Sequence, residues 1–134
     1  MDSVALVHLL ARQVPSLAPL LTEHVATYDE LLPHVFFGEL TPWLIALKDG
    51  AAADHAVLAA TLSLLEDAWK VGDDSVRDVI SISFIENLQG RGQLRAMQPH
   101  FGPALSSWAD CFEDARPSLP RKGWLGKLFR RGRA

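Results

Sequence analysis

Several features that mark particular classes of protein are missing from this 134-residue sequence. Cys111 is the only cysteine, which excludes a disulfide framework. No stretch approaches the roughly 18 apolar residues of a membrane-spanning helix. The N-terminus carries Asp2 instead of a basic segment and lacks a small-residue cleavage site. We therefore expect no export signal and a cytoplasmic protein.

Motifs that assemble a catalytic or cofactor site are also missing. The sequence contains no HExxH or CxxC metal motif, no GxSxG elbow and no glycine-rich phosphate loop. None of its five histidines stands three or four residues from another histidine or from Cys111, so none shares a helix face with a second ligand. Asp110 adjoins Cys111, and a nearby carboxylate disfavours the reactive thiolate. We expect no catalytic activity, no cofactor and no metal.

The residues that are present predict one all-α domain. Apolar residues make up 49% and charged residues 22% of the chain, which is typical of a globular protein with a buried core. The apolar residues recur at helical spacing almost throughout. We expect an antiparallel bundle or array of six to seven helices over residues 1–116, followed by a short basic amphipathic tail over residues 117–134.

Local signals place the first helices. Asp2 or Ser3 is expected to cap the first helix, which Pro15 ends. Ser16 is expected to cap the second helix, and its buried face is expected to hold Leu17, Leu20, Leu21, Val25 and Tyr28.

A third helical stretch covers residues 31–48 and contains Pro42. The proline predicts a kinked pair of helices, and the alternative is a new helix capped by Thr41.

The later helices carry clearer signals. Residues 51–71 form the strongest helical pattern, and Gly72 is its natural C′ residue. Asp73 or Asp74 is expected to cap a central, buried helix over residues 75–88. Residues 79–85 also alternate as a strand would, but the flanking periodicity favours a helix. Further helices are expected at 94–100 and 103–115.

Charge is divided unevenly along the chain. Residues 1–120 hold seven basic and 16 acidic residues, and residues 121–134 hold six basic residues and no acidic one. An acidic body repels nucleic acid and attracts basic proteins, so nucleic acid is not the expected partner. The alternative is that the charge only keeps the surface soluble.

The tail has an amphipathic pattern, with Trp124, Leu125, Leu128 and Phe129 on one helical stripe. It predicts an anionic membrane surface as one partner of the tail, and nucleic-acid phosphate or a partner protein as others. The alternative is that the tail folds back on the acidic body or is only a solubilising end. The residues expected to contact a membrane are Lys122, Trp124, Lys127, Phe129, Arg130 and Arg131.

Two short motifs resemble those of a known family. Residues 30–34 read Glu-Leu-Leu-Pro-His, followed by Glu39-Leu40 and Trp43-Leu44, and residues 83–88 read Ser-Phe-Ile-Glu-Asn-Leu. They resemble a family of small all-helical bacterial domains of unknown function, whose second motif has leucine where this chain has Ile85. The resemblance covers about residues 3–115. Such domains look similar to immunity proteins encoded beside bacterial toxins, and the residues this concerns are His34, Glu39, Glu86 and Asn87.

These observations favour a non-enzymatic domain that binds a partner protein, such as a basic toxin, through its acidic surface. Exposed aromatic anchors beside carboxylates are expected at Trp69, near Asp73 and Asp74, and at Trp108, near Asp110.

Several alternatives stay open. Glu86 and Asn87 either join this recognition surface or form a helix-end network with Arg91 or Arg95. The protein could instead be a peripheral membrane protein or adaptor anchored by its tail. The remaining alternatives are a homodimer and an enzyme that uses His34, Glu39 and Glu86.

Overall fold

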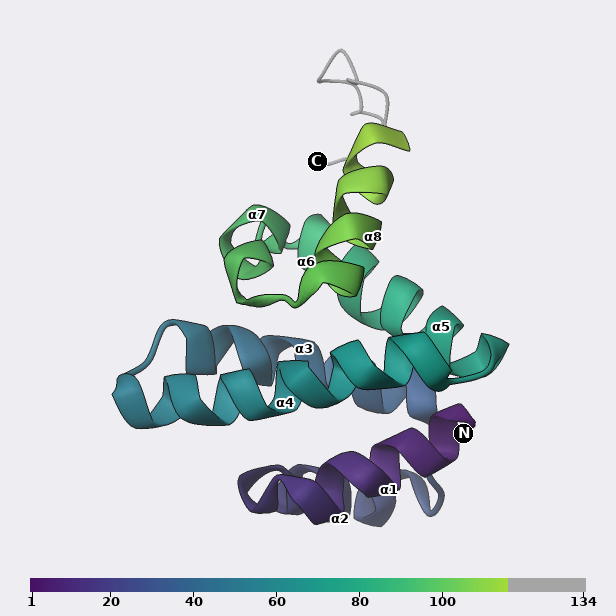
Figure 1. Ribbon diagram of the computed structural model, residues 1–134. Coiled ribbons are helices and arrows are strands. Elements are labelled where there is room, and N and C mark those ends of the chain that lie inside the picture. The colour runs from purple at the N-terminus through teal and green to yellow at the C-terminus, as the bar shows by residue number, and fades with distance from the viewer. Residues whose placement is uncertain (116–134) are drawn as a thin grey trace.

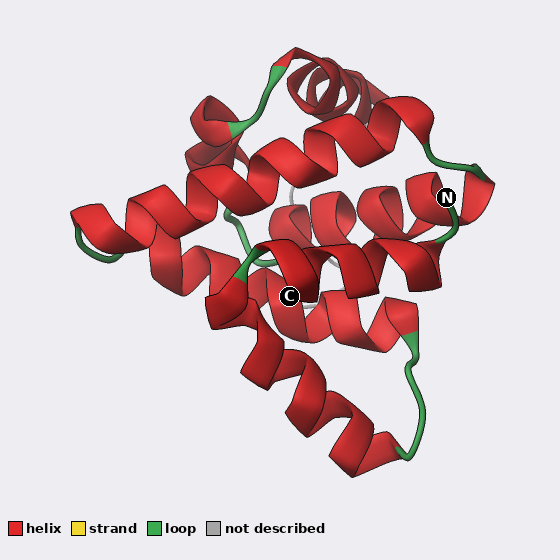
Figure 2. Cartoon of the chain, turned by 60° about the horizontal axis from the view of Figure 1, so that its bottom comes forward, coloured by secondary structure: helices red, strands yellow, loops and turns green. Residues whose placement is uncertain are grey.

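The computed structural model describes residues 1–115, with side chains as far as Cys111, and this part of the chain is helical with short loops (Figure 2). It contains no strand, which confirms the predicted all-α fold and the helical assignment of residues 79–85. The helical segments are α1 (Ser3–Gln13), a 3₁₀ turn (Pro15–Leu17) leading into α2 (Ala18–Tyr28), α3 (Pro33–Lys48), α4 (Ala52–Val71), α5 (Asp74–Ile80) continued by a π turn (Ser81–Glu86) and α6 (Asn87–Gly90), α7 (Leu94–Met97) with a 3₁₀ turn (Gln98–His100), and α8 (Pro103–Ala115).

The long helices α3 and α4 lie side by side in the middle of the molecule (Figure 1). Helices α1 and α2 cover one side of this pair, and α6, α7 and α8 lie on the other. Phe36, Phe37 and Phe84 are completely buried between these layers, together with leucines from α1, α3 and α4. Burial of this apolar surface is the main stabilising contribution to the fold.

Two aspartates cap helices as predicted. The Asp2 side chain accepts a hydrogen bond from the Ala5 amide at 2.9 Å, and that of Asp73 accepts one from the Val76 amide at 3.2 Å. Gly72 ends α4, but in an extended conformation (φ −77°) rather than the left-handed one expected of a C′ glycine. Glycine is needed here because the backbone lies close to α5, and a Cβ at this position would lie 2.6 Å from the Val76 side chain.

The prediction for α2 was wrong at its start and in part for its inner face. Leu17 is buried and Leu20 and Leu21 are partly buried, as expected. Ser16 lies within the 3₁₀ turn, and no side chain caps α2. Val25 and Tyr28 are 40% and 42% exposed, whereas His24 is 2% exposed. A 3₁₀ turn holds three residues instead of 3.6, so it rotates the following helix relative to a continuous α-helical pattern.

Helix α3 continues through Pro42 as one helix, so the predicted pair of helices and the alternative of a new helix beginning at Thr41 were both wrong. The buried Thr41 hydroxyl lies 2.7 Å from the Phe37 carbonyl and 3.0 Å from the Ser83 carbonyl, and its single proton is shared between them. Thr41 thereby links α3 to the π turn instead of starting a helix.

Glu66 is a buried carboxylate on α4, and it holds the start of α8. Its two oxygens accept hydrogen bonds from the backbone amides of Ala104 and Leu105. These amides belong to the first turn of α8 and have no partner within that helix. A Cβ at Gly102 would lie 2.6 Å from the Glu66 carboxyl carbon, so the adjoining loop requires glycine.

Among the described residues no single helix is long and apolar enough to cross a membrane; α1 and the segment Pro15–Tyr28 pass this test only as a pair, bent by 114°.

We expect Glu66→Ala to lower the free energy of unfolding by about 2 kcal/mol, because two amides in the first turn of α8 lose a charged acceptor. Asp67→Ala, at the exposed next position of α4, is the control and should change it by less than about 0.5 kcal/mol. Urea unfolding followed by circular dichroism measures both values. Equal effects of the two substitutions would refute this role of Glu66.

Candidate functional site

The two sequence motifs meet in space. Nδ1 of His34, in the first turn of α3, lies 2.7 Å from Oγ of Ser83 in the π turn. The Ser83 carbonyl also accepts a hydrogen bond from Asn87 Nδ2 at 3.3 Å. The His34 and Thr41 contacts with Ser83 fasten α3 to the π turn.

Asn87 takes part in a local network with Arg91, as one of the sequence-based alternatives expected. Arg91, however, was expected to pair with Glu86. Arg91 Nε donates to Asn87 Oδ1 at 2.9 Å and so serves Asn87, not Glu86. Glu86 is exposed. Of the residues considered for an enzyme site, His34 contacts Ser83, and Glu39 contacts His24.

Glu39 belongs to a different site, on the side of α3 that faces α2. Its Oε1 lies 3.0 Å from Nδ1 of His24, whose side chain is completely buried, while the Glu39 side chain is 34% exposed. The other ring nitrogen of His24, Nε2, accepts a hydrogen bond from the Leu32 amide at 3.0 Å. Because Nε2 is an acceptor, the ring is neutral and its proton lies on Nδ1, which donates to Glu39.

His24 thereby fastens α2, the α2–α3 loop and α3 with two bonds. Its ring also contacts Phe36 edge-on at 5.6 Å between ring centroids, and Tyr28 at 4.9 Å. The loop itself turns through Asp29, which ends α2 in the left-handed conformation (φ 63°).

A surface hollow of about 250 Å³ opens beside this contact. It is lined by Leu20, Glu23, His24 and Thr27 of α2 and by Glu39 of α3. A water molecule occupies roughly 30 Å³ in the liquid, so the hollow has room for one side-chain head group. Two carboxylates in its wall make it suited to a hydrogen-bond donor or a cation.

The surroundings of the hollow strengthen its negative potential. Residues 13–47 contain four acidic residues and no lysine or arginine. The carboxylates are Glu23, Asp29, Glu30 and Glu39. An incoming cation therefore meets no like charge from this stretch of the chain.

Trp69 and Trp108, the expected aromatic anchors, are packed on each other, so only the expectation that they are exposed was wrong. Both are half-buried, with ring centroids 5.5 Å apart. Trp108 Nε1 donates to Ser81 Oγ at 3.0 Å, and the Arg77 guanidinium lies 5.4 Å from the centre of the Trp69 ring. The pair joins α4 to α8 and contacts the segment that begins with α5.

Asp73 and Asp74 lie exposed at the start of α5, where Asp73 acts as the cap. The Ser75 hydroxyl donates to Asp73 Oδ1 at 2.6 Å, and this bond, with the Val76 amide, holds the pKa of Asp73 below its ordinary value. Ser75 Oγ also accepts from the Ser3 amide at 3.0 Å, which ties α1 to α5. Asp73 is thus fixed by the fold, and Asp74 lies in the first helical turn.

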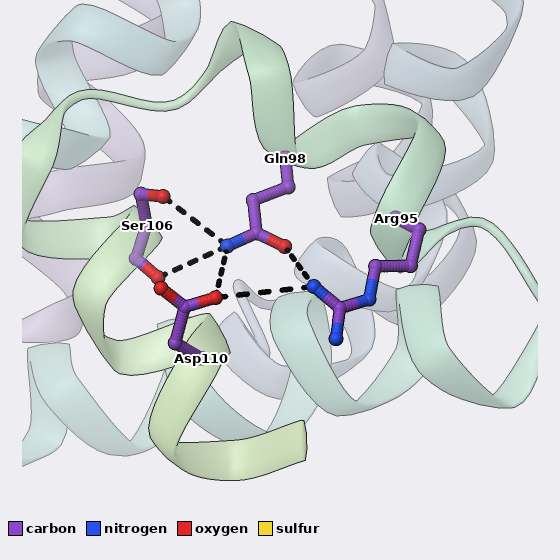
Figure 3. A network of polar contacts seen from close by, with 4 residues as sticks. All are labelled: Arg95, Gln98, Ser106 and Asp110. Atoms are coloured by element: carbon purple, nitrogen blue, oxygen red, sulfur yellow. Dashed lines mark hydrogen bonds and ion pairs between the residues drawn. The ribbon is translucent and has the colours of Figure 1, made fainter. Parts of the chain in front are cut away.

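Asp110 joins a surface network between α7 and α8 (Figure 3). Gln98 Nε2 lies 2.7 Å from Asp110 Oδ1 and 3.2 Å from both Ser106 oxygens, Oγ and the carbonyl. Arg95 Nη1 donates to Gln98 Oε1 at 3.3 Å and lies 3.9 Å from Asp110. The Arg95 and Asp110 side chains are both more than half exposed, so this ion pair adds little stability.

No group of three or more histidine, cysteine, aspartate or glutamate residues within the described part of the chain could hold a metal ion. The ring centroids of His55 and His100 lie 6.3 Å apart, and His55 Nε2 lies 2.9 Å from the Lys48 carbonyl oxygen. The membrane-contact residues expected in the tail lie outside the described residues.

A family model matches residues 7–114, which is most of the chain. It describes a domain of unknown function, DUF7674. The chain belongs to the DUF7674 family. No curated protein and no solved structure matches it. The matched range of this DUF7674 domain includes the hollow and both motifs, and it ends before the basic tail.

Sequence reasoning named Glu39 but missed His24, its hydrogen-bond partner, and Glu23, which lines the same hollow. A signal was present, because His24 stands seven residues after Leu17 and four after Leu20, on the buried stripe of α2. A histidine on an apolar stripe needs hydrogen-bond partners, and nearby carboxylates are natural ones.

We expect His24→Phe to lower the free energy of unfolding by about 2 kcal/mol, since phenylalanine keeps the ring contacts but leaves the Leu32 amide without its acceptor. Amide hydrogen exchange at Leu32 should become faster in the same variant. His8→Phe, on the exposed side of α1, should change neither quantity. Unchanged exchange at Leu32 would contradict the bond assigned to His24.

Ser75→Ala should raise the pKa of Asp73 towards its ordinary value, because the hydroxyl that stabilises the carboxylate is removed. With a folded-state pKa below that of the unfolded chain, Asp73 stabilises the fold at neutral pH, and this contribution is lost as the pH falls through the folded-state pKa. An NMR pH titration of the Asp73 carboxyl measures the shift. Ser63→Ala, an exposed position on α4, should leave it unchanged, and an unaltered pKa in Ser75→Ala would contradict the assignment.

Proposed function

We propose that this DUF7674 domain is a non-enzymatic binding protein that associates stoichiometrically with a basic partner protein. The observation that supports this function is the hollow of Glu23, His24 and Glu39, set in a stretch of 35 residues without a lysine or arginine. Its carboxylates are suited to one lysine or arginine head group of the partner.

The charge of the whole described body supports the same conclusion. Residues 1–115 contain 16 acidic and six basic residues. Arg77 donates to the Trp69 carbonyl, and Arg91 donates to Asn87. Among the described residues, the lysine and arginine side chains that pair with a carboxylate are Lys48, with Asp49, and Arg95, with Asp110. An excess of acidic groups raises the association rate with a basic protein and disfavours anionic partners.

Such a protein acts by covering a surface of its partner and catalyses no reaction. A toxin that acts on nucleic acid needs a basic cleft, because it must bind phosphate. An acidic domain seated over that cleft excludes the substrate, with long-range attraction setting the rate and one buried cation setting the position. We therefore propose a bacterial immunity protein that acts in the cytosol as the specific form of this function.

The test is capture of the partner by the tagged full-length chain in its native host, with mass spectrometry of the bound proteins. One dominant basic protein at a near-equal ratio is expected at physiological salt, and less of it at high salt, where charge attraction is screened. If no partner is retained at either salt concentration, the proposal fails.

Two matched variants test whether the captured partner binds at the hollow. Glu23→Lys should reduce recovery of the partner roughly tenfold, since a like charge at a contact disfavours binding. Asp78→Lys makes the same charge change at an exposed position of α5 and should have a much smaller effect. Equal losses would show that net charge, and not the hollow, governs binding.

A further inference from the structure

The hollow beside His24 offers hydrogen-bond acceptors but no free side-chain donor. Its polar lining consists of Glu23, His24 and Thr27 of α2 and Glu39 of α3. The Thr27 hydroxyl donates to the Glu23 carbonyl at 2.9 Å, and the Nδ1 proton of His24 is donated to Glu39 Oε1. Both side-chain donors in the wall are therefore used within the fold. A ligand that binds in this hollow must supply the donors itself.

The acceptors that remain come from two helices. Glu23 belongs to α2 and Glu39 to α3. Within the described part of the chain, both carboxylate oxygens of Glu23 and the second one of Glu39, Oε2, have no hydrogen-bond partner. A single head group that enters the hollow can therefore bind two carboxylates at once.

Glu39 is held in place before any ligand arrives. The buried His24 ring accepts from the Leu32 amide at Nε2 and donates to Glu39 Oε1, which leaves Oε2 available. A carboxylate that is already oriented loses less conformational entropy when a ligand binds. Glu23 and Thr27 are exposed, so a side chain of another protein has access to the hollow.

The two strongly basic side chains of proteins differ in how they fit such a site. A lysine ammonium is a compact, strongly hydrated charge with three donors, whereas an arginine guanidinium is a planar, more weakly hydrated fork with five donors. Two edges of the fork can bond two carboxylates at the same time. Its weakly hydrated face can also lie against an apolar wall, which Leu20 supplies here.

We infer that the hollow is an arginine-binding site that selects arginine over lysine. One edge of the guanidinium of a partner arginine donates to Glu23, another edge donates to Glu39 Oε2, and its face lies against Leu20. His24 is a positioning residue that acts through Glu39. This inference rests on the proposed function, since it names the side chain of the basic partner that enters the hollow.

The experiment compares two capped peptides that differ only in one head group, acetyl-Gly-Arg-Gly-amide and acetyl-Gly-Lys-Gly-amide. Each is titrated into the ¹⁵N-labelled full-length chain at constant ionic strength, and NMR shifts of the Glu23, Thr27 and Glu39 amides report binding at the hollow. We expect the arginine peptide to bind at least about threefold more tightly, because the guanidinium bonds both carboxylates.

A conservative variant tests the role of the second carboxylate. Glu39→Gln keeps an oxygen that accepts from His24, but its NH₂ group then faces the hollow in place of Oε2, so the preference for arginine should fall to less than about 1.5-fold. Asp78→Asn is the matched control: it removes one charge at an exposed position of α5 and should leave the preference unchanged.

Equal affinities of the two peptides would overturn the inference. So would a lack of binding by both peptides, shifts confined to residues outside the hollow, or a preference for arginine that survives Glu39→Gln. The two proposals fail separately. If a basic partner is captured and the two peptides bind alike, the selectivity for arginine is wrong and the proposed function stands. If no basic partner is captured, the proposed function is the one that fails, whichever peptide binds.

Discussion

The hydrogen bonds of His24 are the constraint on which the α2 side of the molecule depends. The ring must accept from the Leu32 amide and donate to Glu39 at once, which requires the neutral imidazole in one orientation. This arrangement fixes the rotation of α2 against α3. That rotation places Glu23 at the rim of the hollow and turns Val25 and Tyr28 to solvent. The acidic hollow and the exposure of Val25 and Tyr28 are therefore two results of one local interaction.

Much of the fold could be predicted from single residues and spacing. The Asp2 and Asp73 caps, the long helix before Gly72 and the all-α architecture follow from local rules, and the structure confirms them. The rest depends on contacts between distant residues. The rotation of α2 follows from a 3₁₀ turn and from bonds that join His24 to Leu32 and Glu39 across the loop. Continuity of α3 through Pro42 accompanies the contact of Thr41 with Ser83, 42 positions later.

The candidate site was predictable only in part, and for the same reason. Glu39 was named from a motif, but the aromatic anchors Trp69 and Trp108 were chosen because carboxylates lie near them in the sequence. In the structure the two rings contact each other, which a linear pattern does not show. The motif residues His34 and Ser83 turn out to fasten two segments together. Family motifs in this domain therefore mark a junction of the fold, and the first motif also contributes Glu39 to the proposed binding hollow.

The π turn at Ser81–Glu86 has a consequence for the tolerated length of the chain. A π turn accommodates one residue more than an α turn over about the same rotation, so a chain that lacks one residue there would form a regular α-helix and keep the later residues on the same helix faces. Leu88 would then stay in the core. Anywhere else between Asp74 and Gly90, loss of one residue would turn the later residues by about 100° about the helix axis. Related chains should therefore lose a residue of this segment only at the π turn.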